Sequence, residues 1–319
     1  MRLILIFPLT SEARIAIIRA MANNSSIQSS NKGGSTRAQR LPPARLIDQP
    51  VEFSALINQL RGRPALALDT ESDSLYRYFY KVCVVQLSTP DADYIIDPLS
   101  LPDLASFGAL MADPTVEKVF HAAENDILML KRAYGFKFAH IFDTMLAARI
   151  LGWRHVSLAA LLDEQFSVQL DKRAQLTDWG KRPLTPEQLS YAHLDSHFLL
   201  PLRDLLASEL RARGRWDEAQ EAFAALPEVA YVEKPFDPDG FWRSKGARDL
   251  APQELAVLRE LYLWRDAKAR TLDLPPFKVI DDRSLALLST LQPQRAGDLP
   301  LSPYQSSRYG REVLAAIER

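Results

Sequence analysis

Four acidic residues in three separated segments are the side chains of this sequence best suited to do chemistry. They are Asp69, Glu71, Asp126 and Asp195. Each lies where a carboxylate is unfavourable, at the end of an apolar segment or on a helix of apolar spacing. If the fold gathers them, two like charges about 4 Å apart repel by about 4 kcal/mol at an effective dielectric of 20. Such a cluster needs cations, so the sequence predicts two divalent metal ions held by these four carboxylates.

The chemistry expected of this cluster is the hydrolysis of a phosphodiester bond. Carboxylate oxygens favour Mg²⁺ or Mn²⁺ over zinc. Two such ions roughly 3.5–4 Å apart stabilise both the attacking and the leaving oxygen of an in-line displacement. Tyr191 precedes Asp195 by four residues, so the two side chains share one face of a helix. Because a phenol with an ordinary pKa of about 10 is a poor base at neutral pH, we expect the Tyr191 hydroxyl to orient the attacking water.

The first acidic pair ends a strand of a predicted mixed sheet. Asp69 and Glu71 follow an apolar segment and stand two residues apart, so in an extended chain they face the same side. Three such segments in succession, joined by short turns, predict an antiparallel meander. The predicted strands cover residues 64–69, 81–88, 94–97, 117–121 and 139–142. With the helices between them, they predict an α/β domain around a mixed five-stranded sheet.

The other two acids lie on predicted helices. Asp126 is in the first turn of a helix over residues 124–134, which Gly135 ends. Asp195 lies on a helix that begins after Thr185, with Pro186 at its first position, and is expected to reach about residue 213. Carboxylates from strand ends and helix faces can therefore converge on one cavity.

The chain is expected to contain two domains and a tail. Residues 46–213 form the α/β domain, and residues 214–250, which are interrupted by several prolines, are predicted to be a linker. Apolar residues then recur at helical spacing over residues 252–270 and 282–291. We therefore predict a small all-helical domain over residues 251–319.

Residues 1–45 are excluded from the predicted fold. They are basic, and residues 22–44 are rich in Asn, Ser, Gly and Arg, so we expect a disordered tail. The chain shows no apolar stretch of transmembrane length, so no membrane partner is expected. Its single cysteine, Cys83, lies in an apolar run, which excludes a disulfide framework and favours a reducing compartment. We expect a cytoplasmic protein, or a mitochondrial one if the tail is a transit peptide; Met21 is an alternative start. The oligomeric state stays open.

The acidic motifs, in order, resemble the DEDD exonuclease superfamily. Asp-x-Glu at residues 69–71, Asp126, and Tyr-x-x-x-Asp at residues 191–195 match its DEDDy branch. Longer blocks are similar to ribonuclease D and its relatives, namely Leu68-Asp69-Thr70-Glu71, His121-Ala122-x-x-x-Asp126, Phe142-Asp143-Thr144-Met145 and Thr177-Asp178-Trp179-x-x-Arg182-Pro183-Leu184. Leu261-Tyr262-Leu263-Trp264-Arg265-Asp266 is similar to an HRDC domain. The resemblance covers roughly residues 46–319.

This resemblance implies an RNase H-like 3′→5′ exonuclease that removes nucleotides one at a time from a free 3′ end. RNA is favoured over DNA by analogy, in the maturation or turnover of transfer RNA or other structured RNA. In the family pattern Asp69, Glu71, Asp126 and Asp195 hold two metal ions and Tyr191 positions the water. Among the neighbouring motif residues, Thr70, His121 and Asn125 are candidates for substrate binding.

Two alternatives stay open beside an exoribonuclease. The chain could be a DNA 3′→5′ exonuclease, because HRDC domains also occur in DNA helicases. It could also be a catalytically silent nucleic-acid-binding protein on the same fold. The presence of all four acids together with Tyr191 argues against the silent protein, since inactive relatives need not keep them.

Several other polar residues are expected to serve structure. His193 and His197 are spaced like zinc ligands, but the glutamate of an HExxH motif is absent, so we expect packing or surface positions. Asp143 is expected to cap the helix that follows it, or to support the site through hydrogen bonds, rather than to bind metal. Trp179 and Arg182 are expected to form a packed corner before the long helix rather than to contact nucleic acid.

Overall fold

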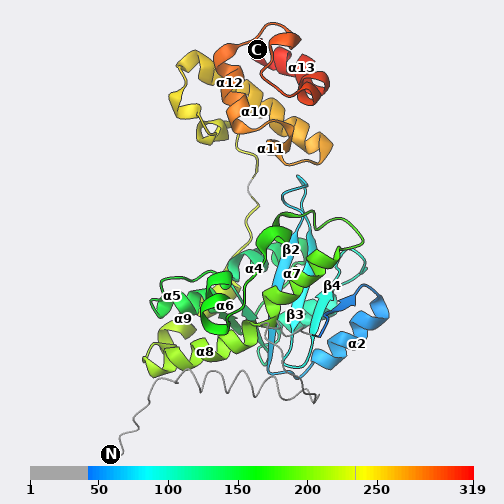
Figure 1. The fold of residues 1–319 in the computed structure, drawn as a ribbon, viewed down its shortest axis with the longest axis vertical. Coiled ribbons are helices and arrows are strands. Elements are labelled where there is room, and N and C mark those ends of the chain that lie inside the picture. The colour runs from blue at the N-terminus through cyan, green and yellow to red at the C-terminus, as the bar shows by residue number, and fades with distance from the viewer. Residues whose placement is uncertain (1–41, 234) are drawn as a thin grey trace, which may run out of the picture.

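The described residues fold around two large apolar cores, which correspond to the two coloured parts in Figure 1, and a smaller apolar cluster lies between the sheet and the helix α7 (Pro186–His197). The computed structural model describes residues 42–233 and 235–319. The first core lies within residues 47–226 and the second within residues 241–317. The predicted order, an α/β domain followed by a small helical domain, is confirmed. The predicted disordered tail lies almost entirely outside the described residues.

A mixed sheet forms the centre of the first part. Among the described residues it has six strands, in the order β1-β4-β3-β2-β5-β6. The strands are β1 (Arg45–Ile47), β2 (Ala65–Ser72), β3 (Val82–Ser88), β4 (Asp93–Ile96), β5 (Glu117–Phe120) and β6 (Ile141–Asp143). β2, β3 and β4 form the predicted antiparallel meander, and β1, β5 and β6 join it in parallel.

The prediction of five strands is wrong by one, because it omits β1. This strand has three residues, of which only Ile47 is buried, so it shows no alternation that a sequence pattern can reveal. Parallel pairing with β4, in which Leu46 lies opposite Ile95, defines it instead. The edge of the sheet is therefore set by a long-range contact.

Helices surround the sheet, and one of them packs across the strand that carries the first acidic pair. The helices of the first part are α2 (Pro50–Leu60), α3 (Ala105–Ala112), α4 (Glu124–Tyr134), α5 (Thr144–Ile150), α6 (Leu158–Phe166), α7 (Pro186–His197), α8 (Leu199–Ala212) and α9 (Trp216–Ala225), with the short 3₁₀ helices η1 (Lys172–Leu176) and η2 (Leu226–Glu228). α7 packs across β2, β3 and β4, and α8 contacts β2 and β5. Figure 1 shows α7 lying over β2 and β3.

The long helix predicted from Thr185 to about residue 213 is two helices. Its start is as predicted, because Thr185 and Gln188 form a capping box and Pro186 occupies the first turn. The single continuous helix is wrong, since α7 ends at His197 and α8 begins at Leu199. Pro201 gives the reason: a proline inside a helix has no N–H and its ring clashes with the carbonyl four residues earlier, which belongs to His197.

The segment predicted as a linker contains regular structure at both ends. α9 packs into the first core through Phe223, whose ring lies 4.6 Å from that of Phe142. The Lys131 ammonium on α4 donates to the carbonyls of Pro227 (2.6 Å) and Val229 (2.7 Å), which fixes the exit of the chain. From Phe241 onward the chain belongs to the second core. The connection between the two cores is therefore shorter than residues 214–250.

The second part is purely helical in the residues described. It contains the 3₁₀ helices η3 (Pro238–Arg243), η4 (Ala247–Asp249) and η5 (Ala296–Asp298) and the helices α10 (Pro252–Leu272), α11 (Pro276–Val279), α12 (Asp282–Leu291) and α13 (Pro303–Ile317). α10 is its centre and packs against α11, α12 and α13.

The two parts contact each other through the loop between β2 and β3. The Tyr78 hydroxyl donates to Asp266 Oδ1 (2.7 Å) and accepts from Arg270 Nε (3.0 Å), both on α10. The backbone N–H of Phe79 donates to Asp273 Oδ1 (3.0 Å). The Lys278 ammonium lies 3.4 Å from the centre of the Tyr76 ring. The second part therefore binds the loop that follows the strand carrying Asp69 and Glu71.

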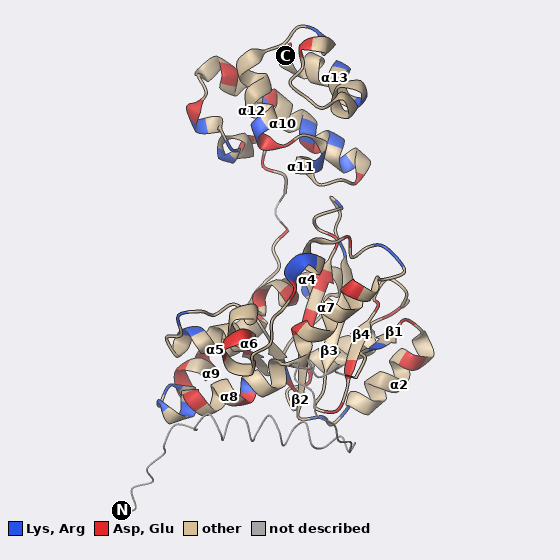
Figure 2. Ribbon diagram, in the orientation of Figure 1, with Lys and Arg blue, Asp and Glu red and all other residues tan. Residues whose placement is uncertain are grey.

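Charge and burial agree with the composition. Figure 2 shows acidic and basic residues interspersed along the helices of both parts. Cys83 is buried, in keeping with its apolar run, and burial raises the pKa of its thiol to about 12. In the part of the chain that the structure describes, none of the helices has the length and apolar character needed to cross a membrane.

Candidate active site

Three of the four predicted carboxylates come together beside α7. One oxygen from each of Asp69, Glu71 and Asp195 lies within 4.8 Å of the others. Asp69 and Glu71 lie near the C-terminal end of β2, and Asp195 is on α7, the helix that packs across this strand. Segments more than 120 residues apart in the sequence thus supply one cluster.

Asp126 joins this cluster from the first turn of α4. Its carboxylate is buried and accepts a hydrogen bond from Thr70 Oγ1 at 2.5 Å. Thr70 stands between Asp69 and Glu71, so this bond ties the fourth acid to the strand that carries the first two. The structure therefore gives Thr70, a candidate for substrate binding, a different contact, in which it orients Asp126.

Asp143 fixes the turn that leads into α4. Its Oδ2 accepts from Ala123 N (2.9 Å), and its Oδ1 accepts from Ala122 N (3.1 Å) and from Met145 N (2.8 Å). Ala122 has a left-handed backbone with φ 61°, which is rare outside glycine and needs such support. Asp143 is thus a cap of α5 and a hydrogen-bond support for the Asp126 segment, as predicted.

The carboxylates of the cluster have raised pKa values. Burial raises the pKa of Glu71 to about 10, with repulsion from Asp69, Asp195 and Asp126 adding to it. Burial, together with Asp195, raises the pKa of Asp69 well above its usual range. Burial also raises the pKa of Asp195 to about 7, against the opposing effects of the Tyr191 hydroxyl and of Lys172. The charges around Glu71 are thus other carboxylates, which is the condition that divalent cations relieve.

The Tyr191 hydroxyl keeps its proton at any physiological pH. Burial raises its pKa far above the ordinary value, and the nearby Asp195 and Glu71 carboxylates add to the shift. Its ring lies 6.1 Å from that of Trp179, which is fully buried. Tyr191 is therefore a hydrogen-bond donor at the edge of the cluster rather than a base.

The two other candidates for substrate binding lie just before α4 and in its first turn. His121 Nδ1 is 2.9 Å from Thr144 Oγ1, whose own proton goes to the Phe120 carbonyl (3.1 Å). Burial lowers the pKa of His121 to about 4. The neutral ring thus donates through Nδ1 and keeps Nε2 as an acceptor. Asn125 is exposed in the first turn of α4. Their role in binding stays a prediction.

The opposite face of α7 carries the two histidines, and both are packed. His193 Nε2 and His197 Nδ1 lie 2.8 and 2.9 Å from the same oxygen, Asp93 Oδ2 on β4. Burial alone would raise the pKa of Asp93, but these two hydrogen bonds outweigh it and lower the pKa. Both rings pack against β4, as expected. The three side chains are also close enough to share an ion, so the absence of zinc stays a prediction.

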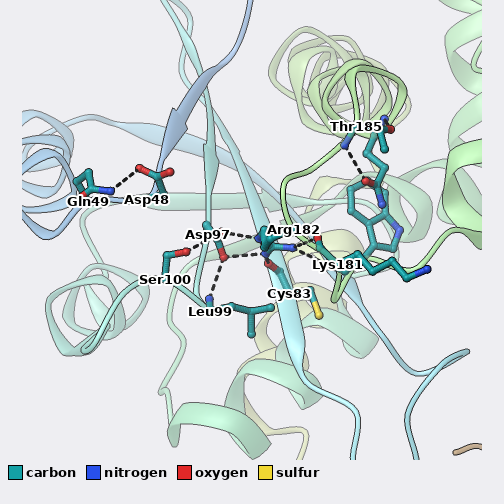
Figure 3. Close-up of polar contacts among 11 residues, drawn as sticks. Asp48, Gln49, Cys83, Asp97, Leu99, Ser100, Lys181, Arg182 and Thr185 are labelled. Carbon is teal, nitrogen blue, oxygen red and sulfur yellow. Dashed lines mark hydrogen bonds and ion pairs between the residues drawn. The ribbon is translucent and has the colours of Figure 1, made fainter.

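A packed corner before α7 holds the helix against the sheet, as Figure 3 shows. The Arg182 guanidinium donates to both oxygens of Asp97 (2.6 and 2.7 Å) and to the carbonyls of Cys83 (2.7 Å) and Trp179 (2.7 Å). These bonds join the end of β4, the strand β3 and the segment that enters α7. The prediction that Trp179 and Arg182 form a packed corner is confirmed.

Sequence reasoning missed one buried polar side chain near the cluster. Gln86, in the middle of β3, is fully buried, and within the described residues neither atom of its amide has a hydrogen-bond partner. A glutamine inside a run of apolar strand residues is the only trace of it in the sequence, and such a residue is easily taken for a packing variant.

Both parts of the chain match known protein families. Residues 44–211 match the family model described as 3′-5′ exonuclease, and residues 254–317 match the HRDC domain. Ribonuclease D of Nitrobacter hamburgensis is 32% identical over 281 residues, which cover 86% of this chain and 73% of that protein. The chain belongs to the ribonuclease D family. It is a 3′→5′ exonuclease with a C-terminal HRDC domain, as the resemblance of its motifs predicts.

Solved structures of this ribonuclease D family and its relatives share the fold. The catalytic core of RRP6 from Trypanosoma brucei has a TM-score of 0.79 at 26% identity, covering 97% of this chain and 87% of that one. Escherichia coli RNase D has a TM-score of 0.65 at 29% identity, covering 86% and 74%. Brucella melitensis NrnC, solved with bound Mg²⁺, has a TM-score of 0.50 at 26% identity, covering 59% and 91%. The family relationship thus implies a divalent metal ion for this chain.

Proposed function

We propose that this exonuclease degrades RNA from its free 3′ end, one nucleotide at a time, with two Mg²⁺ or Mn²⁺ ions held by Asp69, Glu71, Asp126 and Asp195. The observation that carries the proposal is the gathering of oxygens from Asp69, Glu71 and Asp195 within 4.8 Å. Repulsion in this group, added to burial, raises the pKa of Glu71 to about 10. External cations are the simplest way to ionise all four carboxylates at neutral pH.

The residues present fit divalent ions by their chemistry. All four donors are carboxylates, which are the ligands that Mg²⁺ and Mn²⁺ prefer. Thr70 restrains Asp126 from one side (2.5 Å), so this donor is already oriented. When bound, the ions would neutralise the cluster and stabilise the charge that develops on the phosphate oxygens during displacement.

The side chains of the protein then orient the reactants. Tyr191 holds its proton at neutral pH, so it can donate a hydrogen bond to the phosphate or to the attacking water but cannot accept its proton. His121, neutral with a free Nε2, is an acceptor for a sugar hydroxyl or for a base edge. Asn125, exposed beside Asp126, offers an amide to the same substrate.

RNA is the proposed polymer, by the relationship to E. coli RNase D, which is described as an exoribonuclease involved in structured RNA processing. Precursors or decay intermediates of transfer RNA and other structured RNA fit this class. The DNA exonuclease and the silent binding protein are the competing functions that an assay must separate.

One assay with labelled single strands distinguishes these functions. RNA and DNA of the same sequence, labelled at the 5′ end, are incubated with Mg²⁺, Mn²⁺ or EDTA, with Asp195→Asn as the inactive control. Shortening of RNA one nucleotide at a time, stopped by EDTA, is the expected result. Degradation of DNA in preference to RNA would favour the DNA exonuclease, and binding of either strand without shortening would overturn the proposal.

A further inference from the structure

Gln86 is an anomaly at the centre of the sheet. Its side chain is fully buried, and among the described residues both its amide nitrogen and its carbonyl oxygen lack a hydrogen-bond partner. Buried polar groups are nearly always paired, because an unpaired one loses its water without compensation. The other residues of β3 at buried positions include Val82, Val84 and Val85, so an apolar side chain would suit this strand. A hydrogen-bond partner that is in place only when the site is occupied would explain why a buried amide stands here.

The register of the sheet places Gln86 next to a proposed metal ligand. In the antiparallel pair β2–β3, Gln86 lies directly opposite Asp69. Side chains of directly paired residues point to the same face of the sheet, with Cβ atoms about 4.5–5.5 Å apart. On its other side Gln86 pairs with Ile95, which packs with Trp179 and Ala192 under α7. Gln86 therefore lies on the face of the sheet that α7 covers, beside Asp69 and beneath the helix that carries Asp195.

We propose that Gln86 is a positioning residue for the metal site, whose NH₂ group donates to Asp69 when this carboxylate holds a metal ion. A carboxylate that gives one oxygen to a metal has a second oxygen to be held, and such outer hydrogen bonds fix the direction of the ligand. An amide suits this place for a reason of charge. A lysine or arginine here would neutralise the cluster and compete with the ions, whereas a neutral NH₂ orients Asp69 without adding charge.

The inference rests on the proposed metal-dependent function, and Gln86→Met tests it without an activity assay. Methionine has a similar length and no hydrogen-bonding groups of comparable strength. In EDTA the variant should unfold at a higher temperature than the wild type, by about 2–4 °C, because an unpaired buried amide is removed. Its affinity for Mn²⁺, measured by titration calorimetry and by the electron paramagnetic resonance of free Mn²⁺, should fall by about tenfold.

Gln188→Met is the matched control. Gln188 is also buried, but its amide is paired: it donates to Thr177 Oγ1 (3.0 Å) and accepts from Thr185 N (2.9 Å). In EDTA this variant should unfold at a lower temperature than the wild type. The two glutamines thus differ in the sign of the shift, and that difference separates an unpaired amide from ordinary packing. Gln86→Leu serves as a second variant if methionine packs poorly.

Each outcome decides the matter. A higher unfolding temperature in EDTA with weaker Mn²⁺ binding supports the positioning role. Unchanged Mn²⁺ affinity in both Gln86 variants, with normal binding by the wild type, overturns this inference and leaves the proposed function intact. A lower unfolding temperature in both variants assigns Gln86 to packing alone. Wild-type protein that binds no Mn²⁺ would overturn both proposals.

Discussion

Two groups of buried carboxylates lie on either side of α7, and they differ in their counter-charges. Asp93 and Asp97, at the β4 side, have cationic or N–H partners from the protein itself: His193 and His197 for the first, and Arg182 for the second. The group on the β2 side has mainly other carboxylates for neighbours. Carboxylates thus occur in two opposite electrostatic states around one sheet.

The pKa values record this difference. Burial alone would raise the pKa of Asp97, but the Arg182 guanidinium outweighs burial and lowers it. For Glu71, burial and repulsion act in the same direction and raise the pKa to about 10. A buried acid with a protein partner is a structural element, whereas a buried group of acids without one needs a cation from solution. This contrast supports the metal site proposed on the β2 side of α7.

The largest expected effect comes from removing a carboxylate of the proposed metal site. Asp195→Asn should lower the rate of 3′-nucleotide release at least about 10³-fold, because several kcal/mol of transition-state stabilisation depend on the ions. The same change should raise the unfolding temperature in EDTA, since it removes one of the repelling groups. A variant that keeps activity near the wild-type level would show that Asp195 is not a ligand.

Removing a partner on the structural side should have the opposite effect on stability. Arg182→Met leaves Asp97 buried without its counter-charge, which should cost about 3–5 kcal/mol in the free energy of unfolding. Urea unfolding followed by tryptophan fluorescence, to which the buried Trp179 contributes, measures this loss. In the double variant Arg182→Met with Asp97→Asn, part of the stability should return; if it does not, packing rather than charge accounts for the loss.

The pH dependence of the metal-free protein should separate the two groups. The pKa of Glu71 is raised from 4.5 to about 10 and that of Asp195 from 3.8 to about 7, so the folded chain binds more protons than the unfolded chain between about pH 5 and 9. Stability contributed by this cluster must fall as the pH rises through that window. Asp93 and Asp97, whose pKa values are lowered, lose their contribution only as the pH falls below about 4.

Thermal unfolding in EDTA between pH 5 and 9 tests this prediction. The unfolding temperature should decrease by several degrees across the range, and saturating Mg²⁺ should remove most of the decrease. Glu71→Gln provides the control, because its slope in EDTA should be smaller than that of the wild type. A wild-type unfolding temperature that rises with pH in EDTA would contradict the raised pKa values.

The smallest effect is expected for Tyr191→Phe. Because the phenol keeps its proton, its loss removes one hydrogen bond to the reactants and no proton transfer, so kcat should fall by about tenfold. The pH profile of kcat should keep its shape, which distinguishes an orienting hydroxyl from a base. Loss of a limb of the profile in the variant would assign a titration to Tyr191.

The sequence predicts those features that local patterns determine. The helix over residues 124–134 is found with the same bounds and with Gly135 in the left-handed conformation that ends it. The capping box at Thr185 and Gln188 likewise starts α7 where the pattern places it. The acids at 69, 71 and 195 converge because a strand end and a helix face fix their directions.

The features that the sequence misses depend on partners far along the chain. β1 exists because Leu46 pairs with Ile95, and no property of residues 45–47 alone reveals it. The Thr70 hydroxyl meets Asp126 across 56 residues, and Asp93 meets His193 across 100. The division between α7 and α8 was in reach of sequence reasoning, since Pro201 forbids the bond to His197. Hydrogen-bond partners of single polar side chains need the fold.

The contacts of the HRDC domain with the β2–β3 loop affect how the activity of truncated forms should be interpreted. Tyr78 places its hydroxyl between Asp266 and Arg270, and its loop follows directly from the strand that bears Glu71. A fragment that stops before α10 would leave this tyrosine without either partner, a few residues from the carboxylates of the proposed metal site. Such a fragment is a perturbed enzyme rather than a smaller one, and a fall in its turnover would not by itself assign RNA binding to the missing domain.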